Sequence, residues 1–193
     1  MKRKLLAVAM VLCCLAIVTG GSLAYFTAED KAHNVITTGN IDIELQELTD
    51  QVDEEGNPIP FEDLEGVMPG SSASKIVQVK NTGSQPAWVR VSVDKTVQLA
   101  ESVEGEGDPA LITMDFNQEE WTEKDGFYYY NHVLAPGETT QPLFTAVTFD
   151  SAMDNLYQGS EISVDVCAYA TQSANNGETV LEAQGWPAPA AQG

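Results

Sequence analysis

The sequence predicts an all-β protein, an antiparallel β-sandwich with long acidic loops and one short helical turn. Two observations support this fold class. Short segments with alternating apolar and polar residues recur between residues 40 and 170, and turn signals rich in Gly, Pro, Asn and Asp separate them. No long amphipathic helical pattern interrupts this series. Seven or eight such strands are typical of a sandwich of two packed sheets.

The first 24 residues have the three parts of a secretory signal peptide. A basic MKRK start is followed by the apolar run Leu5–Val18 and by the small residues Ser22 and Ala24. The apolar run is shorter than the roughly 20 residues that span a bilayer, so an uncleaved anchor is the weaker alternative. We predict cleavage between Ala24 and Tyr25, with membrane contact only through the leader before cleavage.

The charge of the chain is strongly negative. Nine Lys and Arg oppose 29 Asp and Glu, which gives a net charge of −20. Three of the nine bases lie in the leader, which has no acid, so its removal takes the net charge to −23. Such a surface repels nucleic acid and anionic lipid. Cys13 and Cys14 also leave with the leader, so only Cys167 remains and no internal disulfide forms.

The first half of the mature chain has three predicted strands. Asn40–Leu45 alternates strictly, with Ile41, Ile43 and Leu45 on one face. Thr49–Glu65 is acidic and contains Gly and Pro, which predicts an exposed loop or hairpin tip. Lys75–Lys80 and Ala87–Asp94 follow as strands, and Asn81–Pro86 between them predicts a hairpin connection. In the last of these strands, Arg90 is expected to pair with an acidic residue.

The second half begins with another acidic loop and continues with further strands. Asp125-Gly126 predicts a hairpin turn before the aromatic strand Phe127–Tyr130. Strands are expected at Gln141–Phe149 and Glu161–Ala170, with a helical turn within Ser151–Gln158. The last strand should direct Cys167 outward, as a partly covered and unreactive thiol. The predicted organisation is a leader (1–24), an N-terminal segment (25–36), a sandwich domain (37–174) and a flexible tail (175–193), whose Trp186 docks back onto the domain.

The sequence contains no motif typical of a catalytic or metal-binding site. His33 and His132 have no H-E-x-x-H context, and no glycine-framed nucleophile is present. The acidic loops Thr49–Glu65 and Glu101–Pro109 lack calcium-loop spacing, so solvated loops are expected and calcium is the alternative. For the aromatic run Phe127–Tyr130, cross-strand packing is expected and a carbohydrate platform is the alternative. We therefore predict no catalytic residue, no cofactor and no metal site.

Several stretches, taken in order, resemble one known family. They are GGSLAYFT at the end of the leader, NVITTGNIDIEL after it, the V-x-N-x-G pattern of Val79–Gly83, the WVRVSV strand, DGFYYYNHVLAPGETT, and Asn155–Gly159. Together they extend from about Gly20 to Gln172. On these motifs the chain is similar to the TasA/camelysin (CalY) family of exported biofilm-matrix and cell-surface proteins.

The resemblance implies a jelly-roll-like sandwich, secretion, and leader removal by a SipW-like signal peptidase. It also implies extracellular fibres, in which the N-terminal segment of one subunit completes the sheet of the next. The expected partners are then other copies of the chain and other matrix proteins. Tyr25–Ile36 is the candidate donor strand, with anchors at Tyr25, Phe26, Val35 and Ile36; pairing within its own domain is the alternative. A camelysin-like metalloprotease and a monomeric binding module are the competing functions.

Overall fold

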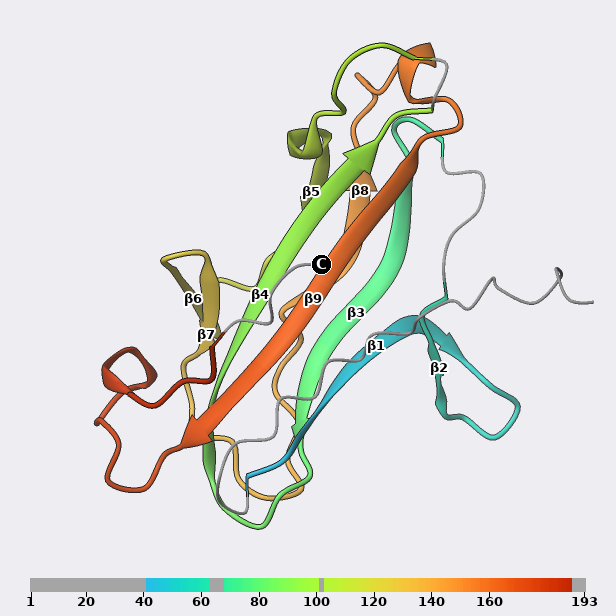
Figure 1. The fold of residues 1–193 in the computed structure, drawn as a ribbon. Helices are drawn as coiled ribbons and strands as arrows, with labels where there is room; N and C mark the ends of the chain where they lie inside the picture. The colour runs from blue at the N-terminus through green and yellow to red at the C-terminus, as the bar shows by residue number, and fades with distance from the viewer. Residues whose placement is uncertain (1–40, 63–67, 101–102, 189–193) are drawn as a thin grey trace, which may run out of the picture. The chain divides into compact units, whose positions relative to one another are not determined.

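The structure, a computed structural model, describes residues 41–62, 68–100 and 103–188 (Figure 1). The predicted leader and N-terminal segment lie outside these residues. The described strands are β1 (Ile43–Val52), β2 (Pro58–Pro60), β3 (Ser72–Asn81), β4 (Ala87–Gln98), β5 (Ile112–Met114), β6 (Trp121–Lys124), β7 (Phe127–Tyr130), β8 (Phe144–Phe149) and β9 (Glu161–Gln172). Short 3-10 helical turns occur at η1 (Pro109–Leu111), η2 (Asn155–Tyr157) and η3 (Val180–Glu182).

The strands form two antiparallel sheets, which confirms the predicted all-β class. Sheet A has the order β2-β1-β3-β8-β5, and sheet B has the order β6-β7-β4-β9. β4 and β9 pair along twelve consecutive residues, from Ala87 opposite Gln172 to Gln98 opposite Glu161. Figure 1 shows these two long strands side by side. The two sheets share one apolar core, as in a β-sandwich.

The predicted hairpin between Lys75–Lys80 and Ala87–Asp94 is wrong. β3 pairs with β1 and β8, whereas β4 pairs with β7 and β9, so the two strands belong to different sheets. Asn81–Pro86 therefore carries the chain from one sheet to the other. Hairpin turn residues and a sheet-to-sheet crossing have the same local composition, so the sequence alone could not distinguish them.

Two hairpins were predicted correctly. The acidic segment after Thr49 forms the β1–β2 hairpin, whose turn is held by Asp53, since Oδ1 of Asp53 accepts hydrogen bonds from the backbone N–H groups of Glu55 and Asn57. At the β6–β7 turn, Asp125 and Gly126 have φ of 52° and 78°. Two successive positive φ values are what a type I′ turn requires, and Asp-Gly adopts them at low cost.

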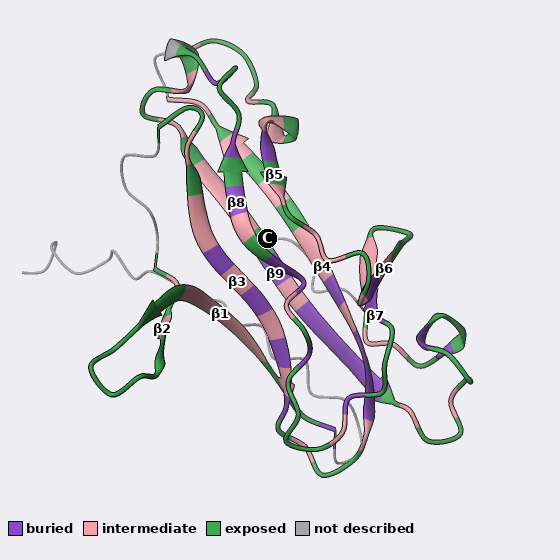
Figure 2. Cartoon of the chain, turned by 180° about the vertical axis from the view of Figure 1, so that it is seen from behind, coloured by how far each residue is buried: buried purple, intermediate pink, exposed green. Residues whose placement is uncertain are grey.

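The core lies between the sheets, and β3, β4 and β9 contribute alternate residues to it (Figure 2). Ile41 and Ile43 are buried while Asp42 and Glu44 are exposed, so the predicted faces of the first strand are confirmed. The fully enclosed members are Val77 and Val79 of β3, Val89 and Val91 of β4, Ile112, Leu134, Leu143 and Phe144. The predicted inward positions of the last strand are also correct, with Val166 and Ala168 buried.

The prediction of a flexible tail from residue 175 is wrong for residues 175–188. This segment folds back over sheet B and contains η3, and Val180 retains only 3% of its surface exposed. Trp186 packs against the same cluster, as expected. The physical reason is that sheet B carries apolar aromatic residues on its outer face, and the segment removes them from water.

Candidate functional site

The most distinctive feature for function is a pair of neighbouring strand edges, β9 of sheet B and Ile43–Gln46 of β1 in sheet A. We call the two together the open edge. Among the described residues, β9 pairs on one side only, with β4, and Ile43–Gln46 pairs on one side only, with β3. β1 and β9 are in contact, although they belong to different sheets. A long strand with a free side presents backbone N–H and C=O groups to any extended chain that approaches.

The core beside the open edge is incompletely covered. Leu45 on β1 and Ile162 and Val164 on β9 pack against the core but stay partly exposed. Towards the other end of β9 the inward side chains, from Val166 onward, are buried. On β9 the half-exposed apolar residues therefore lie along its N-terminal half, where an added strand with alternating apolar side chains would cover them.

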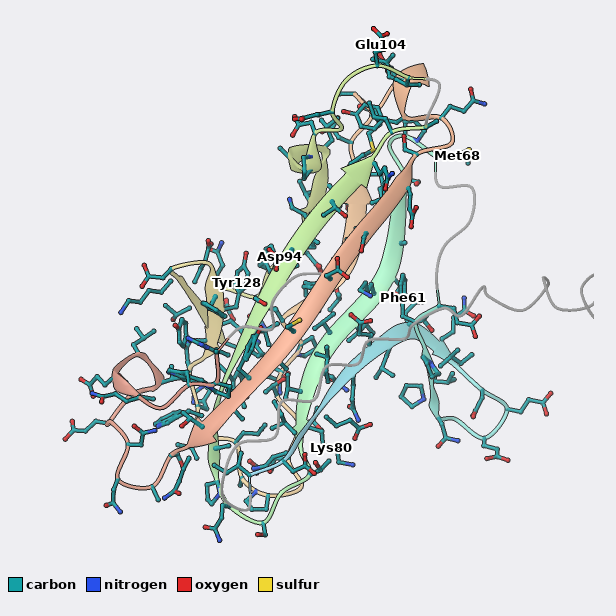
Figure 3. All side chains as sticks on the ribbon, in the orientation of Figure 1. Phe61, Met68, Lys80, Asp94, Glu104 and Tyr128 are labelled. Atoms are coloured by element: carbon teal, nitrogen blue, oxygen red, sulfur yellow. The ribbon has the colours of Figure 1, made fainter. Side chains whose placement is uncertain are left out.

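A cavity of about 370 Å³ lies at the start of β9. Ile162 forms part of its wall, and the described residues around it are Met68, Pro69, Met153, Asp154, Tyr157 and Gln158. Met153 is a buried core residue, whereas Met68 is 69% exposed and is labelled in Figure 3. The cavity extends the partly covered apolar surface of the open edge around the end of the sandwich.

An ion pair closes the core on the β1 side of the open edge. Nζ of Lys75 lies 3.0 Å from Oε1 of Glu47 and 4.0 Å from the ring centre of Phe61. Lys75 is only 5% exposed, so its charge depends on both partners for compensation. Glu47 faces the interior of the sandwich because it is directly opposite Val77 in the sheet.

Cys167 is on the outer face of β9, as predicted, and is partly covered. Burial raises the pKa of its thiol, and the nearby carboxylates of Asp165, Asp94 and Glu47 act in the same direction, against a hydrogen bond from Tyr169. The thiolate is the reactive form of cysteine. The environment of Cys167 therefore disfavours nucleophilic chemistry.

The model of the Camelysin metallo-endopeptidase family matches residues 1–116, which is more than half of the chain. The chain belongs to the camelysin family. Proteins of this family are associated with the cell surface. None of the curated proteins compared with the chain matches it. In the described residues no helix is long and apolar enough to cross a membrane.

The described part of this camelysin-family chain does not fit the metal that the family description implies. No group of three or more His, Cys, Asp or Glu side chains in residues 41–62, 68–100 and 103–188 is placed to hold a metal ion. His132 lies on the surface, with Nε2 3.0 Å from Oε2 of Glu120. A zinc site takes at least three protein ligands, and this pair supplies two. His33 lies outside the described residues.

The structure explains two of the motifs on which the camelysin resemblance rests. Asn81, in the V-x-N-x-G pattern, is fully buried. Its Nδ2 donates to the carbonyl oxygens of Gln85 and Leu134, and its Oδ1 accepts from the N–H of Gly83, all at 2.9 Å. The backbone of Asn81 also bonds to Gly137 and Glu138, in the A-P-G-E turn of the second motif. The two motifs, far apart in sequence, meet at Asn81.

The aromatic run of the chain packs across strands, as expected. Trp121 lies opposite Tyr130, with ring centres 5.0 Å apart, and Tyr128 stacks on Phe116 at 4.3 Å. Phe127 and Tyr129 point to the other side of β7 and pack with Tyr169 and Trp186.

The expectation that Arg90 pairs with an acid is wrong within the described residues. Its guanidinium carbon lies 4.0 Å from the ring centre of Phe127 and 4.7 Å from that of Trp186. Aromatic faces thus take the place of a carboxylate, which the sequence could not show because Trp186 is far along the chain.

The predicted cleavage site and anchors lie outside the described residues. These are Ala24, Tyr25, Phe26, Val35 and Ile36. They stay predictions. The sequence analysis did not predict the sheet edge to which such a donor strand would add. Ile162 and Val164 read as ordinary core positions, and only the strand order shows that β9 is at an edge.

Proposed function

We propose that this camelysin-family chain is a secreted structural subunit that assembles into extracellular or cell-surface fibres by strand donation. In this proposal the N-terminal segment Tyr25–Ile36 of one copy adds to the open edge of another. The observation that carries the proposal is β9, which has twelve residues and pairs on one side only in the described part of the chain.

The physical basis is strand addition to a sheet edge. Backbone hydrogen bonds along the edge supply affinity, and side chains that fill alternate positions supply register. Tyr25–Ile36 has as many residues as β9. An extended segment of that length spans about 40 Å at roughly 3.3 Å per residue. Apolar residues of the donor would cover Leu45, Ile162 and Val164, which water now reaches.

Charge should control this assembly. A mature chain of net charge −23 repels other copies of itself, and salt screens that repulsion. We therefore expect fibres to form more readily at higher ionic strength or at acidic pH. Faster assembly at low ionic strength and neutral pH would contradict this expectation.

Electron microscopy of the mature protein, beginning at Tyr25, tests the donor. The mature chain should form fibres, and the chain lacking Tyr25–Ile36 should stay a folded monomer. A chain with the same twelve residues in scrambled order is the matched control, since it keeps length and charge but loses the register of the apolar anchors. Fibres of undiminished length from the deletion variant would refute strand donation.

A second pair of variants tests the acceptor. Val164→Lys places a charge among the apolar side chains of the open edge and should block fibre growth, because inward-pointing charges protect sheet edges. Thr96→Lys, on the neighbouring strand β4 and exposed, should leave growth unchanged. Urea unfolding of both variants separates loss of assembly from loss of folding.

Size-exclusion chromatography distinguishes the two alternatives for the N-terminal segment. If Tyr25–Ile36 pairs within its own chain, the intact mature protein should stay monomeric at concentrations well below the millimolar range in which straps would exchange. The same result would favour a monomeric binding module. Concentration-dependent oligomers that disappear on deletion of the segment favour exchange between copies.

The description of the family makes a metallopeptidase the second candidate. Metal analysis of the purified mature protein and a casein-cleavage assay test it. Stoichiometric zinc, together with cleavage that is lost in His33→Ala or His132→Ala, would establish the enzyme. Absence of both zinc and cleavage would remove it.

A further inference from the structure

The outer face of sheet B carries an unusual set of side chains for a surface. Trp88 and Arg90 project from β4, Phe127 and Tyr129 from β7, and Tyr169 from β9. Trp88, Tyr129 and Tyr169 are buried, and Arg90 is half-buried. A contiguous aromatic surface of this kind marks a place where another chain segment binds. We call these five residues the aromatic face.

The segment that covers the aromatic face is the chain's own C-terminal part, residues 176–188, which we call the strap. Val180 and Ala183 of the strap are buried against Trp88 and Tyr129. The ring of Trp186 packs edge-on against Tyr129, with ring centres 5.8 Å apart.

The strap is bound as a peptide ligand is bound, and not as a further strand of the sheet. Side chains of the sheet donate hydrogen bonds to its backbone carbonyls. Nε1 of Trp88 bonds to Asn176 at 2.9 Å, Oγ1 of Thr171 to Gln184 at 3.0 Å, and Nη2 of Arg90 to Pro187 at 3.3 Å. Side-chain donors and an aromatic surface that receive a Trp-Pro dipeptide are the elements of a peptide-recognition groove.

Arg90 joins the strap to the face. Its guanidinium lies over the rings of Phe127 and Trp186 and, at 5.4 Å, over Tyr169. Nε of Arg90 is buried and has no hydrogen-bond partner among the described residues, so the aromatic rings compensate this part of the guanidinium, while Nη1 and Nη2 bond to Tyr129 and Pro187. Cation–π contacts of this kind contribute about 0.5–2 kcal/mol each.

We propose that the aromatic face is a docking site for the strap of a second copy of this chain, so that neighbouring copies can exchange straps. The contacts that hold the strap do not depend on which chain it comes from. The connection between β9 and the strap is short, and Asn175 within it has φ of 57°, a left-handed conformation that a non-glycine residue adopts at some cost. Short connections under strain favour exchange of a terminal element between copies.

Local concentration decides which strap is bound. A short tether holds the chain's own strap at an effective concentration on the order of millimolar. In dilute solution each chain therefore binds its own strap. Where copies are crowded, as on a cell surface or in a matrix, a neighbour's strap competes on equal terms. The contact is separate from the open edge and does not need the N-terminal segment.

Peptide binding tests the site. The probe is a fluorescein-labelled peptide of residues 175–188, and the acceptor is the mature chain with Trp186→Ala, which weakens its own strap. Saturable binding by fluorescence anisotropy is expected. Trp186→Ala in the peptide should weaken binding about tenfold or more, and Arg90→Met in the acceptor should weaken it by about 2- to 30-fold. Lys124→Met, which removes an exposed cation from β6, is the matched control and should change nothing.

Folding and assembly controls keep the outcomes distinct. The milder variant Trp186→Phe serves as the acceptor if the Trp186→Ala chain does not unfold cooperatively in urea. A folded acceptor that fails to bind the peptide, or an Arg90→Met acceptor that binds it equally well, overturns the proposal. In the mature chain, light scattering at millimolar concentration should detect dimers that disappear with excess strap peptide and with Arg90→Met. Association that neither change affects belongs to the open edge, and a strict monomer refutes exchange.

Discussion

The buried side chain of Asn81 offers the sharpest test of how the fold is held together. Asn81→Ala removes three hydrogen bonds of 2.9 Å, two donated by Nδ2 and one accepted by Oδ1. These bonds fix the segment that carries the chain from sheet A to sheet B. The backbone bonds of Asn81 to Gly137 and Glu138 do not involve its side chain, and they should survive the substitution.

The expected loss of unfolding free energy depends on which hydrogen bonds the former partners of the Asn81 side chain still make. The carbonyl of Leu134 keeps a bond from the N–H of Ala87, and the N–H of Gly83 keeps a bond to Asp42. Neither group is left fully unsatisfied, and the third partner, the carbonyl of Gln85, belongs to an exposed residue, so each lost bond costs about 0.5–1.5 kcal/mol. With a small cavity added, the free energy of unfolding should fall by about 2–4 kcal/mol, out of the 5–15 kcal/mol typical of a domain.

Urea unfolding, followed by tryptophan fluorescence, measures this loss. Asn57→Ala is the control, because Asn57 is exposed and bonds only to Asp53 in its own turn, so its loss should stay below about 1 kcal/mol. Asn81→Asp should also destabilise, since a carboxylate oxygen would face the carbonyls of Gln85 and Leu134. Its stability should rise as the pH falls, because protonation restores one donor. A loss below about 1 kcal/mol for Asn81→Ala would refute the reasoning.

Three further predictions rest on single side chains. Burial alone would raise the pKa of Asp115, but hydrogen bonds from the hydroxyl and N–H of Thr145 and from the N–H of Ala146 outweigh it and hold the pKa below its ordinary 3.8. The ionised carboxylate of Asp115 therefore stabilises the fold above pH 3.8, and this stabilisation is lost as the pH falls through the lowered pKa. The urea midpoint of Asp115→Asn should be lower than that of the unsubstituted protein at neutral pH, and it should change less when the pH is lowered. Gly107→Ala would bring its Cβ into contact with the side chain of Val97 and should cost about 1–3 kcal/mol of unfolding free energy, of which Val97→Ala in the same chain should restore a part by removing Cγ1; simple additivity would contradict this contact. Because its pKa is raised, Cys167 should react with iodoacetamide at pH 7.5 more slowly in the folded protein than in urea, and equal rates would contradict its partial burial.

Local patterns were sufficient for most of the strands. Alternation placed Ile41 and Ile43 inside and Asp42 outside, and Asp125-Gly126 fixed a type I′ turn, because these features depend on residues that are neighbours in sequence. Alternation also placed Cys167 on the outer face of β9. The camelysin resemblance, drawn from short motifs, agrees with the family match.

Features that depend on distant contacts were not predictable in the same way. The turn residues of Asn81–Pro86 suit a hairpin as well as a crossing between sheets, and only the pairing of β3 and β4 with different neighbours decides between them. Arg90 reads as a surface charge until Trp186, nearly a hundred positions later, is placed over its guanidinium. The Pro- and Ala-rich composition near the C-terminus suggests flexible chain, yet the strap is ordered by burial against aromatic residues of three strands.

By itself the sequence determined the all-β class and the strand faces, since each follows from local periodicity or composition, whereas the leader stays a prediction. Tertiary structure alone decided the strand order, and with it the open edge. Ile162 and Val164 have the alternation of any core strand, and their partial exposure arises because no described strand lies beyond β9. Edge position is a property of the whole sheet, since it depends on which strands are absent from one side. The binding site of the strap likewise depends on tertiary structure, because it is assembled from residues of β4, β7 and β9.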